Sequence, residues 1–300
     1  MNFILIALCL TAGWLLQRSG ILPNDAHKGI NVWILYIALP AVALLYVPAI
    51  TWTAELIIPV AMPFIVWSGA WLALKLVTRR FPIEKSTQAA LLLTAGLGNT
   101  SFLGFPLTQA YFGDEGLRIA VICDQLSFVV LSTLGVITAI HASSGGKADT
   151  MKIAGNVLRF PPFLAFVAAL LVLRFLDFEP ILPLLETLAG TLIPLALFSV
   201  GLQIRFSEWK DDVRHLSLGL AYKLMVAPAL VLVVALLAQA KGIIAQTSVF
   251  EAATAPMITS AILATEYQLN PRLSNLMVSV GVPLSLFTTA FWWFVVKMLL

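Results

Sequence analysis

Gly96–Pro106 reads G-L-G-N-T-S-F-L-G-F-P and lies in the middle of an otherwise apolar stretch. Three glycines, a proline and the polar residues Asn99, Thr100 and Ser101 therefore fall at membrane depth. Unsatisfied backbone groups in hydrocarbon cost several kcal/mol each, so an irregular backbone survives there only if it is buried or lines a cavity. We interpret the stretch as a broken helix with a binding site at the break. A packing kink, with Ser and Thr bonded back to their own helix, is the alternative.

The composition around this stretch excludes a water-soluble protein. Of the 300 residues 60% are hydrophobic and only 11% are charged, whereas a soluble domain is about 45–50% apolar and about 25% charged. The mean hydropathy is +0.96. A net charge of +3 is too small to indicate a nucleic-acid partner, and both cysteines lie in apolar runs, which argues against a metal site. The chain is expected to be an all-α polytopic membrane protein in contact with the lipid bilayer.

Apolar windows between charged residues and Gly or Pro predict ten transmembrane helices. These windows cover approximately residues 2–20, 30–48, 55–77, 87–110, 115–140, 154–175, 181–204, 213–238, 246–266 and 273–298.

The two halves of the chain resemble each other at an offset of about 155 residues. Pro40 corresponds to Pro194, and Tyr111 corresponds to Tyr267. Five spans in each half would give the halves opposite orientations, which is the inverted-repeat pattern of secondary transporters; chance matches between membrane helices are the alternative. We expect one repeat at 1–141, a linker at 142–152 and a second repeat at 153–300.

The distribution of Lys and Arg predicts the orientation. Of the 18 basic residues, 13 fall on one side of the predicted helices and 4 on the other, and Lys223 lies within a helix. The positive-inside rule places the side with 13 in the cytoplasm. Both termini are then outside, the linker 142–152 is cytoplasmic, and the protein crosses the membrane several times.

A second interruption occurs at Val249–Ala261, which reads V-F-E-A-A-T-A-P-M-I-T-S-A. Pro256 breaks this helix, and Thr254 precedes the break. Two broken helices in opposed repeats would place two half-helix N-termini near the bilayer midplane. Each N-terminus carries about half a positive charge and free N–H groups, which favours an anion such as a carboxylate.

Three ionisable residues are predicted within the membrane, where such residues are functional candidates. Asp124 and Lys223 fall at similar depth in the fifth and eighth helices, and Glu251 lies one turn before Thr254. We expect a mutual Asp124–Lys223 pair that couples proton occupancy to movement, with Glu251 as a reserve partner of Lys223. A static pair that only fixes helix packing is the alternative.

Gly98–Pro106 resembles the helix-four signature of the auxin efflux carrier family, and Asn31–Pro40 and Pro194–Ile204 also resemble stretches of that family. The resemblance implies a ten-helix, five-plus-five inverted repeat, related in fold to bile-acid and sodium/proton exchange proteins. Helices 1, 2, 6 and 7 would form a scaffold, and helices 3–5 and 8–10 a moving transport domain in which helices 4 and 9 cross.

Members of this family export auxin in plants, and bacterial members are linked to dicarboxylates such as malate or malonate. The short linker favours the bacterial type, and the resemblance then implies a multi-pass protein of the bacterial inner membrane. In the family an Asn and a Pro at the crossover contact the substrate, and Asn99 and Pro256 match them. Position 255, where a second Asn would fall, is Ala.

The leading interpretation is a secondary active carrier that moves mono- or dicarboxylates by alternating access of an elevator-like transport domain, without a cofactor. The residues expected to bind substrate are Asn99, Thr100, Ser101, Thr254, Ala255 and Pro256, and those expected to break the helices are Gly98, Gly104, Pro106 and Pro256. A proton or sodium is the expected coupling ion, and a homodimer is a further expectation. A sodium-coupled symporter of the bile-acid-transporter type and a channel remain alternatives. No H-E-x-x-H or Walker A sequence occurs, which argues against a metalloprotease and against ATP as energy source.

Overall fold

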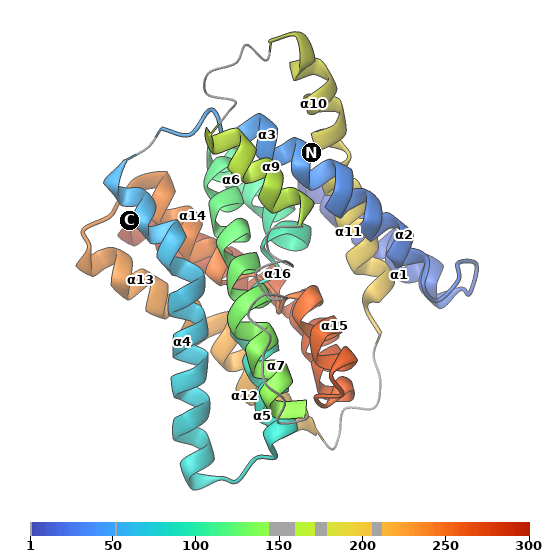
Figure 1. The fold of residues 1–300 in the computed structure, drawn as a ribbon, viewed down its shortest axis with the longest axis vertical. Helices are drawn as coiled ribbons and strands as arrows, with labels where there is room; N and C mark the ends of the chain where they lie inside the picture. The colour runs from blue at the N-terminus through green and yellow to red at the C-terminus, as the bar shows by residue number, and fades with distance from the viewer. Residues whose placement is uncertain (1, 52, 144–159, 172–178, 206–211) are drawn as a thin grey trace.

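The computed structural model describes residues 2–51, 53–143, 160–171, 179–205 and 212–300. Within these ranges the protein is all-helical, with no strand beyond one isolated bridge. Most of the predicted linker 142–152 and both ends of the predicted helix 154–175 lie outside the described residues. Figure 1 follows the chain from blue at the N-terminus to red at the C-terminus.

The helices occur in the order that the sequence predicts, and several are divided by π-helical segments (η). In chain order they are α1 (Asn2–Arg18), α2 (Ala26–Trp33), η1 (Ile34–Ala38), α3 (Leu39–Tyr46), η2 (Ala54–Leu56, a 3₁₀ turn), α4 (Ile57–Arg80), α5 (Lys85–Ala95), η3 (Thr100–Gly104), α6 (Phe105–Val130), η4 (Leu131–Gly135), α7 (Val136–Ser143), α9 (Pro161–Leu171), η6 (Glu179–Ile181, a 3₁₀ turn), α10 (Leu182–Gly190), α11 (Leu192–Gln203), α12 (Val213–Ala221), η8 (Tyr222–Val226), α13 (Ala227–Leu237), α14 (Gly242–Ala252), α15 (Ile258–Glu266) and α16 (Pro271–Leu299).

Six helical stretches of the described chain are long and apolar enough to cross a membrane. They are Ala26–Tyr46, Ala54–Arg80, Thr100–Ser143, Leu182–Gln203, Val213–Leu237 and Pro271–Leu299. The helices α1 and α9 are apolar but shorter. The protein is therefore a polytopic α-helical membrane protein, while the count of ten spans stays a prediction.

The long stretch Thr100–Ser143 turns sharply within α6. Gly113 has φ +67° and ψ −161°, a conformation that side chains with a Cβ rarely adopt. The turn falls between the predicted helices 87–110 and 115–140. The element α6 therefore contains parts of two helices that run in different directions.

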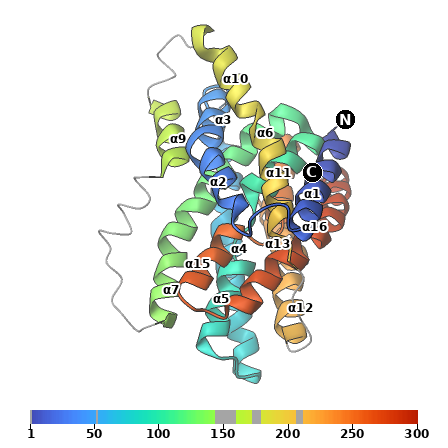
Figure 2. The ribbon, with the colours of Figure 1, turned by 90° about the vertical axis from the view of Figure 1, so that its right-hand side faces the viewer.

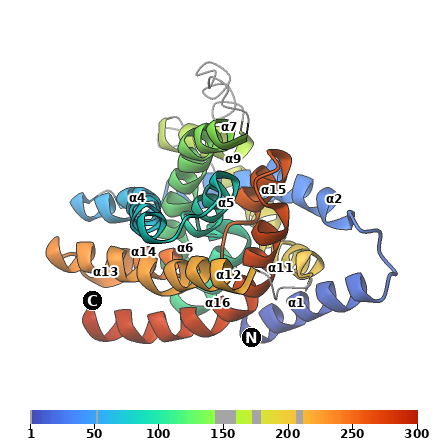
Figure 3. The same cartoon turned by 90° about the horizontal axis from the view of Figure 1, so that it is seen from below.

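Two groups of helices build two large apolar cores. The first core is centred on α1–α3, α9–α11 and part of α6, and it also includes residues of η3 and α14–α16. The second core joins α4, α5, α7 and α12–α16 with other residues of α6. In Figure 1 α4, α13 and α14 lie at the left, whereas α1, α2 and α11 lie at the right. Figure 2 shows α9 and α10 beside α3. Seen from below in Figure 3, α2 and α4 lie on opposite sides of the molecule.

The first group contains a close contact between two backbones far apart in sequence. A Cβ on Gly13 of α1 would lie 2.3 Å from the carbonyl oxygen of Phe198 in α11, and a Cβ on Gly201 would lie 2.4 Å from the carbonyl oxygen of Leu10. Small residues allow such approach between membrane helices. The glycines therefore hold α1 and α11 together as one unit.

Candidate functional site

The two interrupted helices meet at their breaks. The first break separates α5 from η3, and the second separates α14 from α15. The backbone N–H of Asn99 donates to the carbonyl of Ala255 at 2.8 Å, and that of Met257 donates to the carbonyl of Leu97 at 3.2 Å. These bonds enclose an antiparallel bridge between Gly98 and Pro256. Each break thus forms hydrogen bonds with backbone groups that the other leaves free. An irregular backbone at membrane depth requires such bonds, because no water is present to supply them.

The half-helices on either side of the breaks also pack in pairs. The helix before one break packs against the helix after the other, so α14 lies beside α6 and α5 lies beside α15 (Figure 2). The chain after each break begins a new helix at Thr100 or Ile258. Two helix N-termini, with their free N–H groups and positive dipole ends, therefore start at the bridge.

Asn99 is one of the side chains that this arrangement leaves with an unpartnered polar atom. It is 2% exposed, and its backbone carbonyl accepts from the N–H of Gly104 at 2.9 Å. Its side-chain Nδ2 has no hydrogen-bond partner although it is buried. A buried donor without a partner costs about 1–3 kcal/mol. An acceptor atom on a bound molecule would remove that cost.

Thr100 links the first break to the next membrane helix. Its hydroxyl donates to Oδ1 of Asp124 at 2.6 Å, and Gln125 Nε2 lies 3.4 Å from Oδ2 of the same carboxylate. Asp124 is 4% exposed and Ser101, in η3, is 8% exposed. The structure therefore gathers Asn99, Thr100 and Asp124 in one buried polar region.

The polar side chains of the second break bond to their own helix instead. The hydroxyl of Thr254 donates to the carbonyl of Glu251 at 2.7 Å, and that of Ser260 donates to the carbonyl of Met257 at 2.7 Å. Ala255 is fully buried and contributes its backbone carbonyl to the bridge. Pro256 lacks an N–H, so its position in the unwound segment leaves no donor unpaired.

Pro106 has a different place from that predicted. It lies in the first turn of α6, where proline is tolerated, and the break comes before it at Leu97–Asn99. The glycines have clearer roles. A Cβ on Gly98 would lie 2.7 Å from Thr254 Oγ1 and 3.2 Å from Lys223 Nζ. The absence of a side chain at Gly98 therefore allows the two breaks to approach.

Lys223 does not form the expected ion pair with Asp124. It is fully buried in η8, and its Nζ donates to the carbonyl of Ala252 at 2.6 Å. Neither Asp124 nor Glu251 has a carboxylate oxygen within the 4.0 Å that defines an ion pair with Lys223. Ala252 is the last residue of α14, where helix carbonyls are free and the dipole is negative. The ammonium therefore binds a helix C-terminus rather than a carboxylate, which corrects the prediction.

Glu251 faces the first break. It is fully buried, its Oε1 accepts from the hydroxyl of Thr108 at 2.6 Å, and its Oε2 has no hydrogen-bond partner. A Cβ on Gly104 would lie 2.3 Å from that Oε2. Sequence analysis missed Thr108, although it follows Gly104 by one helical turn and so shares its face. Glycine at 104 leaves the space that the carboxylate occupies.

Two cavities approach the paired breaks, and neither is lined by Asn99. One, of about 500 Å³, is lined in part by Ile258 and Ala261 of α15. The other, of about 320 Å³, is lined in part by Phe105 and Pro106 of α6. Among the described residues no group of three His, Cys, Asp or Glu side chains is placed to hold a metal ion.

Comparison with known proteins identifies the kind of molecule that carries this site. Residues 2–293 match the family model described as "Membrane transport protein". An "Uncharacterized transporter" of Methanocaldococcus jannaschii is 26% identical over 302 residues, which cover 97% of each chain. One of Methanothermobacter thermautotrophicus is 25% identical over 93% of this chain and 92% of the relative. The "Putative malonate transporter" of Rhizobium meliloti is 27% identical over 73% of this chain and 70% of the relative.

The match covers nearly the whole chain, both breaks included, and the named relatives are transporters rather than enzymes. The resemblance seen in the sequence is therefore confirmed, with relatives in archaea as well as in a bacterium. The chain belongs to the membrane transport protein family, which is the auxin efflux carrier family.

Proposed function

We propose that this protein is a secondary active carrier that exports small organic anions, mono- or dicarboxylates, by alternating access. The observation that carries the proposal is the buried and unpartnered Nδ2 of Asn99, beside two helix N-termini at the paired breaks. A carboxylate supplies the acceptor that Nδ2 lacks and the negative charge that the two dipoles favour. The name of the Rhizobium meliloti relative makes malonate the first substrate to test.

The moving part in this proposal is the second group of helices. Helices α1–α3 and α9–α11 form the scaffold, and α4–α7 and α12–α16 form the transport domain of a ten-helix inverted repeat in which the broken helices cross. The second apolar core supports this division because all its residues come from α4–α7, α12–α16 and the segments between them, whereas the first core joins residues of both parts. The pairing of Gly98 with Pro256 supports movement of both breaks as one body.

We assign coupling to a proton. Lys223 places a fixed cation against the carbonyl of Ala252 at the second break, and a fixed ammonium repels a sodium ion from the same carbonyl groups. Asp124 and Glu251 are fully buried carboxylates that can each take up a proton near this cation. Protonation changes which conformation tolerates these charges and so shifts the balance between the two states.

The transport test uses purified protein in proteoliposomes loaded with unlabelled malonate. Counterflow accumulation of labelled malonate is expected for a carrier and not for a channel. A pH gradient should drive accumulation with sodium absent. Accumulation that requires a sodium gradient would refute proton coupling, and the absence of binding or flux across a panel of mono- and dicarboxylates would refute the function.

Coupling is tested with Asp124→Asn, which keeps the acceptor for Thr100 but cannot take up a proton in the same way. We expect malonate binding to persist while the dependence of flux on the pH gradient is lost. Glu115→Gln, which changes an exposed carboxylate of the same helix, serves as the control. A variant that loses thermal stability but keeps pH-driven flux would assign Asp124 a structural role.

Orientation is tested by cysteine labelling from each side of the membrane. Both native cysteines, Cys9 and Cys123, are buried. A cysteine at position 144 should react from the cytoplasm, and one replacing Lys241, before α14, should react from outside. The reverse pattern would invert the topology.

A further inference from the structure

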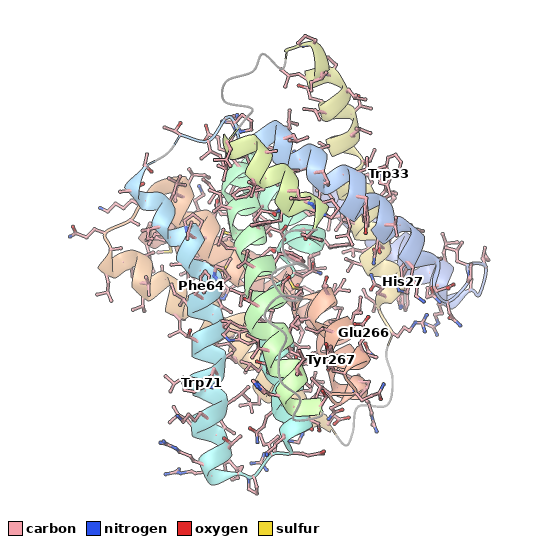
Figure 4. The ribbon with its side chains drawn as sticks, viewed as in Figure 1. His27, Trp33, Phe64, Trp71, Glu266 and Tyr267 are labelled. Atoms are coloured by element: carbon pink, nitrogen blue, oxygen red, sulfur yellow. The ribbon has the colours of Figure 1, made fainter. Side chains whose placement is uncertain are left out.

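The two cavities beside the breaks differ in charge. The larger one, of about 500 Å³, lies between α2 and α11 on one side and α15 and α16 on the other. Among the described residues that line it, Arg205 and Arg272 are fully ionised and none is a carboxylate. His27, labelled beside α11 in Figure 4, also lines it, whereas Glu266, labelled at the end of α15, does not.

Arg205 is held at the entrance of this larger cavity. Its guanidinium Nη2 donates to the backbone carbonyl and the side-chain Oδ1 of Asn24, at 2.9 and 3.1 Å. Its backbone N–H donates to the hydroxyl of Ser279 in α16 at 3.2 Å. These bonds run from the end of α11 to both walls of the cavity. The side chain is exposed, so its charge acts on ions in the entrance.

Arg272 contributes less charge than Arg205. Its Nε lies 3.1 Å from Oδ2 of Asp212, which offsets much of its field. Asp25, the other nearby carboxylate, lies 4.0 Å from the ammonium of Lys28. Arg18 lines a neighbouring cavity that Arg205 also lines, and adds a further positive charge. Arg205 is therefore the main source of positive potential in the entrance.

The smaller cavity, of about 320 Å³, has the opposite character. It lies between α1, α3, α10 and α11 on one side and α6 on the other, and Glu186 is the one fully ionised residue among the described residues that line it. Asp114 is close by, because Tyr46 and Gln109, which both line the cavity, donate to its Oδ1 at 3.3 and 3.0 Å. Arg118, one turn beyond Asp114 in α6, does not line the cavity, but it lies close enough to act on Tyr46 and offsets part of this negative charge.

We propose that this charge difference makes the carrier kinetically asymmetric, with Arg205 collecting organic anions at the entrance of the larger cavity and Glu186 repelling them from the smaller one. This inference rests on the proposed function. Positive potential in a cleft raises the local concentration of anions and their association rate by tenfold or more at low salt. By the distribution of Lys and Arg, the side of Arg205 is cytoplasmic, so capture from the cytoplasm is favoured. The asymmetry changes the half-saturating concentration on each side and leaves the equilibrium set by the coupling gradient unchanged.

The test measures malonate transport separately from each membrane face, using vesicles of opposite orientation. At about 20 mM ionic strength we expect the half-saturating malonate concentration to be roughly tenfold lower on the side of Arg205. At about 500 mM salt, where the Debye length falls to about 4 Å, this difference should largely disappear. Equal and salt-independent values on both faces would overturn the inference, while the absence of any transport would instead refute the proposed function.

Two variants locate the effect. Arg205→Gln should raise the half-saturating concentration three- to tenfold on its own side only, and Arg205→Lys should preserve it because the charge remains. Arg79→Gln, a basic residue at the end of α4 on the same predicted membrane face, is the matched control and should change neither side. An Arg79→Gln effect as large as that of Arg205→Gln would overturn the assignment to the cavity.

Glu186→Gln tests the repulsion of anions from the smaller cavity. This test does not depend on Arg205→Gln and decides whether the charge asymmetry exists if Arg205→Gln does not fold. Glu186 is exposed on α10 and lies outside the paired breaks. We expect a two- to fivefold lower half-saturating concentration on its side and no change on the side of Arg205. An unchanged value on both sides would overturn the repulsive role of the smaller cavity.

Discussion

The two helix breaks have similar backbones and different side-chain chemistry. In the first break Thr100 reaches another helix to bond Asp124, and Asn99 keeps a buried amide without a partner. In the second break Thr254 bonds the carbonyl of Glu251 in its own helix, and position 255 is an alanine whose contribution is its carbonyl. One break presents side chains to the region between the helices, while the other presents backbone.

This difference shows which parts of a paired break are interchangeable. The backbone bridge needs two unwound segments with complementary N–H and C=O groups, and sequences as unlike as G-N-T and A-P-M provide them. The proposed substrate recognition depends instead on an unpaired polar side-chain atom, which the first break supplies with Nδ2 of Asn99. The ionic groups divide in the same way, because Lys223 bonds the backbone of the second break while the carboxylate of Glu251 faces the first.

The largest effect is expected from removing the amide of the first break. Asn99→Ala should weaken malonate binding by about 1.5–3 kcal/mol, or roughly tenfold to a hundredfold, because a hydrogen bond to a charged group is lost. Binding is measured by thermal shift and transport by counterflow. Asn31→Ala is the matched control, since Asn31 lies in α2 and accepts a bond from Ser199 away from the breaks. Equal affinity of Asn99→Ala and the unmodified protein would remove the functional distinction between the two breaks.

A somewhat smaller effect is expected at Gly104 in the first break, where the carboxylate of Glu251 from the second break lies close to the backbone. Gly104→Ala should lower the free energy of unfolding by about 1–3 kcal/mol, because the new methyl group overlaps the Oε2 of Glu251. Gly135→Ala is the control, since Gly135 also lies in a π-helical segment and its Cβ would meet only side-chain and backbone atoms at 3.3 Å or more. Thermal unfolding in detergent provides the measurement.

A double variant tests the origin of that loss. Glu251→Ala removes the overlapping carboxylate, so Gly104→Ala should cost less in the Glu251→Ala background than alone, which is a non-additive result. Additive losses would mean that Gly104 and Glu251 do not interact. The carboxylate of Glu251 would then lie farther from Gly104 in the folded protein.

The smallest effect distinguishes the two threonines. Thr100→Val removes a bond between helices, whereas Thr254→Val removes one within a helix end, so we expect the first to cost about 0.5–1.5 kcal/mol more. Thr100→Val should lower both malonate transport and thermal stability. Thr254→Val should lower thermal stability alone. The comparison of the two breaks fails if Thr254→Val impairs transport as strongly as Thr100→Val.

The sequence by itself determined the class of protein, the order of the helices and the positions of both breaks. Those features follow from local costs: apolar runs without charge need lipid, and glycine, proline and polar residues at membrane depth interrupt a helix wherever it lies. Asn99 and Pro256 could therefore be identified from their neighbours in the chain. The family resemblance had the same basis, because it depended on contiguous motifs, one at the first break and two at Asn31–Pro40 and Pro194–Ile204.

The tertiary structure alone decided which buried groups meet. Spacing along the chain placed Asp124 and Lys223 at similar depth, but depth does not specify the rotation of each helix. The ammonium reached the free carbonyl at the end of α14, and Asp124 was left with Thr100. Likewise Thr108 and Glu251 are 143 residues apart. Their contact depends on how α6 and α14 pack, and such packing is fixed by many weak contacts at once rather than by any local pattern.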